Sequence, residues 1–554
     1  MRRLVLLSLA ALASSGCAPA LAQVGRATPY ADFLIGSYAQ RSRDPVAAAG
    51  RFTAALRASP RDPMLLEGAA DSALAAGNVA ESAAFGRRAQ SAGVHTASGR
   101  LAMATLALRK QRPRQTHELL ANFDGSPVEQ LSARLLDAWA TVAENKPDAA
   151  LAAIGDDSPA PRSPWTAMQF YVRAMMLDEA GRADEALTQY EAGDAVGGLR
   201  IAQIVLLHGE LLERAGRRDD ARALYQSMLD SLDNPGLLAE RARLDRGEPP
   251  PRALSPATGA AISLFALAVL VGEDPSSQEN LAPLALAMTL DPGFEGARLG
   301  FSDAMRALGR GDAARGALAD IPVASPYYET AQSQIAFSLH QDKRDDEAIA
   351  TLKACVAATN GHAARRALAD LYRGLERYGD AAPLYAQLVA EQTPLKPKDW
   401  RLLFAQGATL ERLNRWPESE AALKTALQLA PDQPEVLNYL GYQWVDSGKN
   451  VEEGLAVLQR AVAQRPQEGY IIDSLGWAYY RLGQYAQSVD LLERAVELTP
   501  GDVTLNDHLG DAYWRVGRRI EARFQWRRVL TLSPTDAERG AAAAKVADGL
   551  PPAR

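Results

Sequence analysis

Prolines and glycines recur in the C-terminal part of the chain at a nearly constant step. The prolines stand 35, 34 and 34 residues apart and the glycines 34, 35 and 34; they are Pro431, Pro466, Pro500 and Pro534, and Gly407, Gly441, Gly476 and Gly510. Each interval predicts a pair of antiparallel helices, because proline cannot continue the second helix and glycine lets two helices approach closely. One such pair buries only part of its apolar surface, so neighbouring pairs must stack into a solenoid.

The stretch LGWAYYRLGQYAQSVDLLERAVELTP, residues 475–500, contains the whole register. Gly476 is the close-approach glycine, and Gly483 is placed to end the first helix in a left-handed conformation. Ser488, Leu492 and Ala495 share one face of the second helix. The pattern resembles the tetratricopeptide repeat, which implies an all-α fold of helix-turn-helix units in a right-handed superhelix.

The same register continues upstream with more drift, beginning at Gly36, and gives roughly 13 or 14 units between residues 30 and 534. A solenoid also suits the length of 554 residues, which exceeds the roughly 250–300 residues that one core supports. Apolar residues make up 47% and charged residues 23%, as in a soluble globular protein. The net charge of −7 gives no general attraction to nucleic acid.

Proline-rich sequence suggests how the array is divided. Residues 246–259 are predicted to be a linker between a divergent N-terminal array, 30–245, and a C-terminal array, 260–534. Residues 260–272 are apolar on all sides but too few to span a bilayer, which predicts a buried helix. Residues 535–554 are expected to form a capping helix and a tail.

The N-terminus, MRRLVLLSLAALASSGCAPALAQ, has the charge and apolar pattern of an export signal over residues 1–22. Two processing routes are open. Ala20 and Ala22 fit a secretory cleavage site, whereas Ser14–Cys17 resembles a lipobox in which Cys17 would carry a lipid. Both routes end in the periplasm, soluble or anchored to the outer membrane. The other cysteine, Cys355, then has no partner for an internal disulfide, and we interpret it as a packed thiol.

Aromatic residues cluster on the first helices of the last three units, and position separates them into two classes. Trp444, Tyr479 and Tyr513, three residues after the repeat glycine, fall on the packing face. A second class falls on the concave face, one or four residues after that glycine and two or three before it. This groove stripe consists of Asn438, Tyr439, Tyr442, Asp473, Ser474, Trp477, Tyr480, Asp507, His508, Asp511 and Trp514.

The groove stripe predicts a protein-binding surface. Trp and Tyr supply large contact areas and dominate binding hot spots, and the interleaved Asn, Asp, Ser and His side chains can satisfy a peptide backbone. The alternative is that the rings only cover the inner surface of a tight superhelix or touch one another. Exposed aromatic rings on a concave surface favour binding.

No catalytic constellation is found in the sequence. The six histidines are scattered, and there is no nucleophile elbow, Walker loop or dinucleotide fingerprint. His508 shares a helix face with Asp511 alone, which makes a poor metal site. We therefore expect a protein that is not an enzyme and needs no cofactor.

The segments VLNYLGYQWVDSG, IIDSLGWAYYRLGQYAQSVDLLERAVELTPGD and NDHLGDAYWRVGRRIEARFQWRRVL are similar to the final repeats of exported tetratricopeptide proteins of proteobacterial envelopes. That group includes the lipoprotein adaptor of a periplasmic carboxy-terminal processing protease, which presents cell-wall hydrolases to it. The resemblance implies an envelope scaffold or adaptor. We expect a non-enzymatic scaffold whose groove binds segments of partner proteins, with delivery to an envelope protease as the leading hypothesis. The alternative is a structural component of an envelope or exopolysaccharide assembly or secretion complex.

Overall fold

The structure, a computed structural model, describes residues 28–155, 163–197, 201–251, 254–272, 278–392 and 394–552. Over these ranges it contains thirty α-helices, the short 3-10 helix η2(Pro397–Asp399) and no strand, which confirms the predicted all-α class. None of the described helices has the length and apolar character needed to cross a membrane. The predicted export signal, with Cys17, lies outside the described residues.

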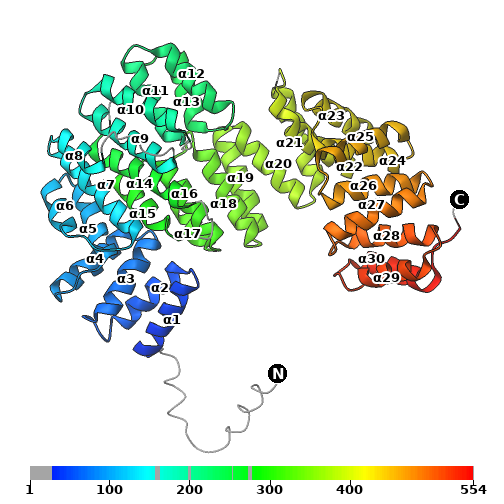
Figure 1. Cartoon of the computed structure of the whole chain (residues 1–554), viewed down its shortest axis with the longest axis horizontal. Helices are drawn as coiled ribbons and strands as arrows, with labels where there is room; N and C mark the ends of the chain where they lie inside the picture. The colour runs from blue at the N-terminus through cyan, green and yellow to red at the C-terminus, as the bar shows by residue number, and fades with distance from the viewer. Residues whose placement is uncertain are drawn as a thin grey trace, which may run out of the picture. The chain divides into compact units, whose positions relative to one another are not determined.

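The chain divides into two compact units, Met1–Thr359 (unit 1) and Asn360–Arg554 (unit 2). Figure 1 labels the helices. Those of unit 1 are α1(Pro29–Arg41), α2(Pro45–Ala55), α3(Pro63–Ala75), α4(Val79–Ser91), α5(Ala97–Arg109), α6(Pro113–Leu120), α7(Pro127–Ala143), α8(Pro147–Ile154), α9(Pro164–Glu179), α10(Ala183–Val196), α11(Ala202–Arg214), α12(Arg218–Leu229), α13(Pro235–Asp245), α14(Pro256–Val271), α15(Leu281–Leu290), α16(Glu295–Ala307), α17(Gly311–Leu318), α18(Tyr328–Gln341) and α19(Asp345–Thr359).

Those of unit 2 are α20(His362–Gly374), α21(Tyr378–Glu391), α22(Trp400–Arg412), α23(Trp416–Leu429), α24(Pro434–Asp446), α25(Val451–Gln464), α26(Gly469–Arg481), α27(Tyr485–Leu498), α28(Val503–Arg515), α29(Arg519–Val529) and α30(Asp536–Asp548). Consecutive helices pack as pairs in both units, as the repeat predicts. Among the described residues, only α13 and the terminal α30 fall outside this pairing, which leaves fourteen pairs.

The repeat glycines act as the sequence predicts. A Cβ at Gly476 would lie 2.8 Å from Leu492 Cγ, so the close approach of α26 to α27 excludes any side chain there. Gly483 follows the end of α26 with φ of +75°, a left-handed conformation that most residues resist. Asp502 caps the N-terminus of α28, the first helix of the next pair, by accepting a hydrogen bond from the Leu505 backbone N–H at 3.0 Å.

Unit 1 is built around α14 and α15. The two helices pack against α3, α5, α7 and α9, the first helices of four successive pairs, and lie between them (Figure 1). At the contact with α7, Trp139 is fully buried and its indole Nε1 donates to Ser263 Oγ at 2.9 Å. A Cβ at Gly259 would lie 2.1 Å from the Trp139 ring, so the two helices touch closely. The predicted buried helix at 260–272 is therefore the core of unit 1.

This arrangement explains where the chain divides. Because α14 is apolar on all sides, it must be enclosed; α7, α9 and α15 pack against it, and α3 and α5 pack against α15. The proline-rich residues 246–259 consequently lead from α13 into α14 within one unit, and the two units divide after Thr359. Part of that stretch is helical, since Pro256 stands in the first turn of α14 and Ser255 caps it.

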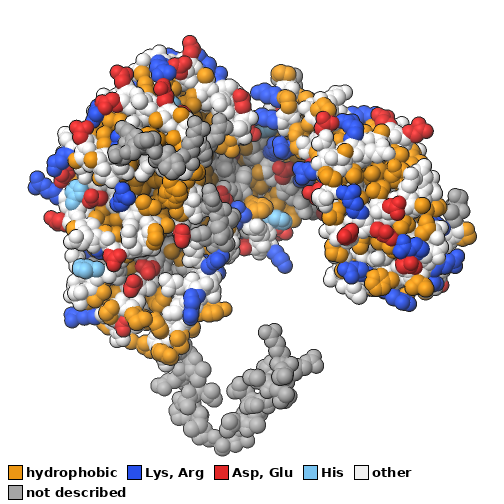
Figure 2. Space-filling model, viewed as in Figure 1, with side chains coloured by type: hydrophobic (Ala, Val, Ile, Leu, Met, Phe, Trp, Pro, Cys, Tyr) orange, Lys and Arg blue, Asp and Glu red, His pale blue; other side chains and the backbone are white. Residues whose placement is uncertain are grey.

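Among its described residues, unit 2 has no helices that occupy the position of α14 and α15. The main contacts of its first helices α22, α24, α26 and α28 are with neighbouring elements of the chain. At the opposite terminus, α1 in unit 1 exposes Tyr30, Leu34 and Tyr38 on one face, and Figure 2 shows hydrophobic side chains gathered at that end. The inner faces of α3, α5, α7 and α9 are thus buried in unit 1, whereas no described helix pair covers those of α22, α24, α26 and α28 in unit 2.

Candidate functional site

The two classes of aromatic residue occupy different environments in unit 2. Trp444 and Tyr513 are buried, as predicted for the packing face, and Tyr479 is half-buried. Each bonds to the second helix of a pair: Trp444 Nε1 donates to Glu420 at 3.0 Å, Tyr513 OH donates to Glu493 at 2.7 Å, and Tyr479 OH accepts from Gln459 at 3.1 Å. In the groove stripe, by contrast, Tyr442, Trp477 and Tyr480 are all half-buried.

The centre of the groove stripe is a stack of three rings. Trp477 lies parallel to Tyr480, with ring centroids 4.5 Å apart, and parallel to His508 on its other side at 3.9 Å. Arg515 Nε donates to the Tyr480 hydroxyl at 3.1 Å, and this contact links α28 to α26. Trp477 is stacked on one ring from its own helix and on one from the next helix pair, so its orientation is fixed before any ligand binds.

His508 of α28 and Asp473 of α26 form an ion pair between successive helix pairs. His508 Nδ1 lies 3.0 Å from both carboxylate oxygens of Asp473. Burial lowers the pKa of His508, but Asp473, with smaller contributions from Asp507 and Asp511, outweighs burial and places that pKa above its ordinary value. Among the residues that the structure describes, no Ser, Thr or Cys side chain bonds to His508.

The end of the groove stripe nearest the C-terminus contacts the chain's own last residues. Lys545 of α30 donates to Asp507 at 2.6 Å and to Asp511 at 2.9 Å. Burial raises the pKa of Asp511 even though Lys545 opposes the shift. Trp514 Nε1 donates to the Leu550 carbonyl at 3.2 Å, and Arg515 donates to that of Pro551 at 2.6 Å. Asp507, Asp511 and Trp514, which the sequence predicts to meet a partner, are thus engaged by the segment 545–551.

The opposite end of the groove stripe is more open. Tyr442 is half-buried, and its hydroxyl has no hydrogen-bond partner among the described residues; burial, with Asp446 and Asp473, raises its pKa to about 12. Asn438 Oδ1 is also buried without a donor. Tyr439 contacts helix α22 of the preceding pair instead, where its ring packs edge-to-face on Phe404 and its hydroxyl donates to Glu411 at 3.0 Å. Ser474 donates to the Tyr470 carbonyl of its own helix.

The sequence interpretation missed several charged residues beside the groove stripe. Arg481 of α26 pairs with Asp446 of α24 at 2.5 Å and also donates to its carbonyl. Asp446, Arg481 and Arg515 all stand five residues after a repeat glycine, which is a signal that the register already contained. Lys545 lies beyond the last repeat, and no register position could have identified it.

The chemistry available on this surface is recognition. Aromatic faces and one unpaired phenol can contact an extended chain, and the fixed stack limits the entropy lost on binding. Among the described residues, no group of three His, Cys, Asp or Glu side chains is arranged to hold a metal ion.

Comparisons with known proteins agree with the repeat. Profiles described as tetratricopeptide repeat match residues 33–94, 366–434, 409–469 and 471–502, so these segments are tetratricopeptide repeats. A TPR repeat-containing protein of Pseudomonas aeruginosa is 29% identical over 102 residues, which cover 18% of this chain and only 17% of that protein.

Solved structures with detectable similarity include a tetratricopeptide repeat protein from Parabacteroides merdae, 13% identical with a TM-score of 0.39, covering 45% of this chain and 98% of that one. The APC/C hetero-tetramer Cut9–Hcn1 is 14% identical with a TM-score of 0.39 and covers 95% of this chain and 98% of that one.

Proposed function

We propose that this tetratricopeptide repeat protein is a periplasmic adaptor without catalytic activity that binds segments of partner proteins on unit 2. The observation that carries the proposal is the surface formed by Tyr442, Trp477 and Tyr480, in which half-buried rings are pre-oriented beside an unpaired hydroxyl. Such a surface offers aromatic contact area at a low entropic cost. We call these three residues the open groove.

We base the proposed periplasmic location on the sequence of the N-terminus. The charged and apolar sequence of residues 1–22 supports export, and either cleavage after Ala22 or lipidation of Cys17 would leave the repeats in the periplasm. Given the resemblance to the adaptor of a carboxy-terminal processing protease, we propose that the partners are an envelope protease and the cell-wall hydrolases delivered to it.

The test is a pull-down from detergent-solubilised envelopes, with bound proteins identified by mass spectrometry. The wild-type chain is compared with the double variant Tyr442→Ala/Trp477→Ala, which removes two rings of the open groove. Phe524→Ala is the matched control, because this ring is 61% exposed on α29 outside the groove stripe. A protease and its substrates should be recovered with wild type and control and be at least about tenfold depleted with the double variant.

Thermal unfolding of the same three proteins separates binding from folding. The double variant should melt within a few degrees of wild type, since both rings are half-buried and a loss of about 1–2 kcal/mol moves the melt little in a chain of this size. Equal recovery of partners by all three proteins would contradict the proposal. Recovery of a multi-subunit assembly without a protease would favour the alternative role in an assembly or secretion complex.

A further inference from the structure

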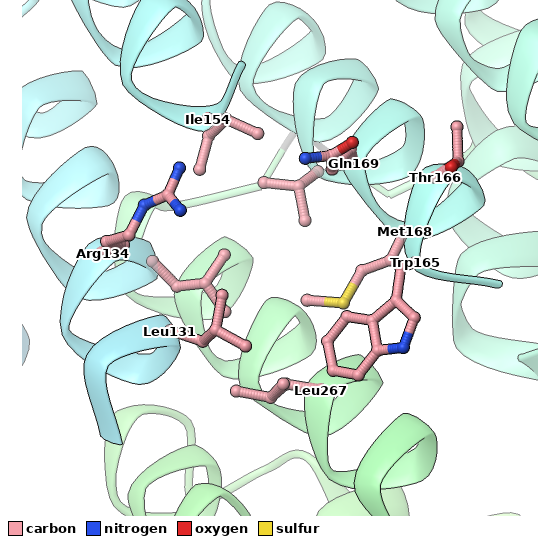
Figure 3. Close-up of a pocket in the computed structure, with 10 residues that line it drawn as sticks. Leu131, Arg134, Ile154, Trp165, Thr166, Met168, Gln169 and Leu267 are labelled. Carbon is pink, nitrogen blue, oxygen red and sulfur yellow. The ribbon is translucent and has the colours of Figure 1, made fainter. Parts of the chain in front are cut away.

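Unit 1 contains a pocket that is separate from the groove stripe. It lies where α7, α8 and α9 meet α14, and its apolar lining comes from all four helices: Leu131, Leu135, Ile154, Trp165, Met168, Val172 and Leu267. Figure 3 shows Arg134 and Trp165 on opposite sides of the pocket. Its volume is about 130 Å³, and a cavity of roughly 150 Å³ holds a benzene ring. The pocket therefore accepts an apolar group about the size of a phenyl ring.

Of the lining residues within the described part of the chain, only Arg134 is charged. Its guanidinium donates once, from Nη2 to the Ala153 carbonyl at 3.1 Å, and makes no ion pair with any residue that the structure describes. A guanidinium has five N–H donors, so most of them remain available. Their planar arrangement matches a carboxylate, which can accept two parallel hydrogen bonds.

Apolar walls with one cation at the side select the chemistry of the ligand. The described lining contains no carboxylate and so offers a cationic ligand no counter-charge, and its few polar groups cannot satisfy a sugar. Gln169 offers one amide near the apolar part. We propose that this pocket binds an amphipathic monocarboxylate, with a phenyl-sized apolar group among Leu131, Met168 and Leu267 and its carboxylate on Arg134.

This chemistry has two natural sources. One is a small aromatic or branched carboxylic acid free in solution, and the other is the last residue of a protein chain that ends in Phe or Leu. Both present a carboxylate within a few bonds of an apolar group. The proposal is independent of the adaptor function of unit 2, because no residue of the pocket belongs to the groove stripe.

Isothermal titration of the full chain tests the proposal with 3-phenylpropionate, and with 3-phenylpropanol as the uncharged analogue. We expect one equivalent of the acid to bind and the alcohol to bind at least about tenfold more weakly. Arg134→Gln should weaken binding of the acid about tenfold and leave that of the alcohol unchanged. Arg87→Gln is the matched control, since Arg87 is exposed on α4 outside the pocket.

A second variant tests the apolar part. Leu131→Trp fills the pocket and should abolish binding of both compounds, while unchanged thermal unfolding shows that the chain still folds. N-acetylphenylalanine and its amide distinguish the sources. If N-acetylphenylalanine binds more tightly than 3-phenylpropionate, the natural ligand is the end of a protein chain. If N-acetylphenylalanine does not bind, the natural ligand is a free acid. No binding of the acid, equal binding of acid and alcohol, or an unaffected Arg134→Gln variant would overturn the proposal.

Discussion

The two units use the inner faces of their first helices in opposite ways. In unit 1 these faces enclose α14 and α15, whose side chains are almost all apolar. In unit 2 the equivalent faces carry Tyr442, Trp477, Tyr480 and His508, and no described helix is inserted between them. The same repeat therefore forms a hydrophobic core in one unit and a candidate recognition surface in the other.

The difference shows what decides between packing and recognition. Trp139 in unit 1 is fully buried, and its indole N–H is satisfied by Ser263. Trp477 in unit 2 is half-buried and stacked only on Tyr480 and His508. Aromatic side chains with a polar end suit a partly hydrated surface, whereas an apolar helix has to be enclosed. Position in the repeat sets the direction of a side chain, and the neighbouring sequence decides what covers it.

The largest expected effect on stability is in unit 1, where α14 and α15 fill the interior. Trp139→Ala leaves a cavity between α7 and α14 and removes the hydrogen bond that Ser263 accepts from the indole. We therefore expect it to lower the free energy of unfolding of unit 1 by about 3–5 kcal/mol. Trp477→Ala should cost less than half as much. Urea unfolding of both variants measures the difference, and equal losses would show that the two rings are equally structural.

The second effect concerns the covered end of the groove stripe. Lys545→Met leaves the buried Asp511 without its cation, and we expect a loss of about 2 kcal/mol. Asp511→Asn in the Lys545→Met background should recover part of that loss, because it removes the uncompensated charge. A double variant whose loss equals the sum of the two single losses would mean that the contact contributes nothing.

The third effect is a dependence of stability on pH. Because the pKa of His508 is raised in the folded chain, its pairing with Asp473 stabilises the fold fully below the ordinary histidine pKa and less as pH rises through the folded value. Wild type should therefore exceed His508→Asn in stability by more at about pH 6 than at about pH 9. Denaturant unfolding at both values measures this difference. If the difference in stability between wild type and His508→Asn were the same at both pH values, the ion pair of His508 with Asp473 would not contribute to folding.

The smallest effect is expected at Arg481. Its pair with Asp446 connects α24 and α26, but both side chains are more than a third exposed. Arg481→Ala should cost under about 1 kcal/mol and less in high salt. A larger loss, unaffected by salt, would indicate that the neighbouring helix pairs α24–α25 and α26–α27 depend on this ion pair for their alignment.

The sequence predicted the helix pairs well because glycine and proline constrain the backbone locally. Gly476 and Gly483 have the roles that their positions indicate. The division of the chain was harder, since residues 246–259 look like a linker and nothing local reveals that α14 packs back against α7 and α9. The coverage of Trp514 by residues after Gly549 was equally hidden, because that contact joins segments with no shared register.

Site-specific photo-crosslinking in living cells tests the central claim most directly. A photoreactive phenylalanine analogue replaces Tyr442 in the open groove of unit 2 or, in the control, Phe524 on the outer face of α29. We predict that the analogue at 442 captures discrete partner proteins and that the analogue at 524 does not. Capture at 524 but not at 442 would contradict the claim that unit 2 binds its partners through the open groove.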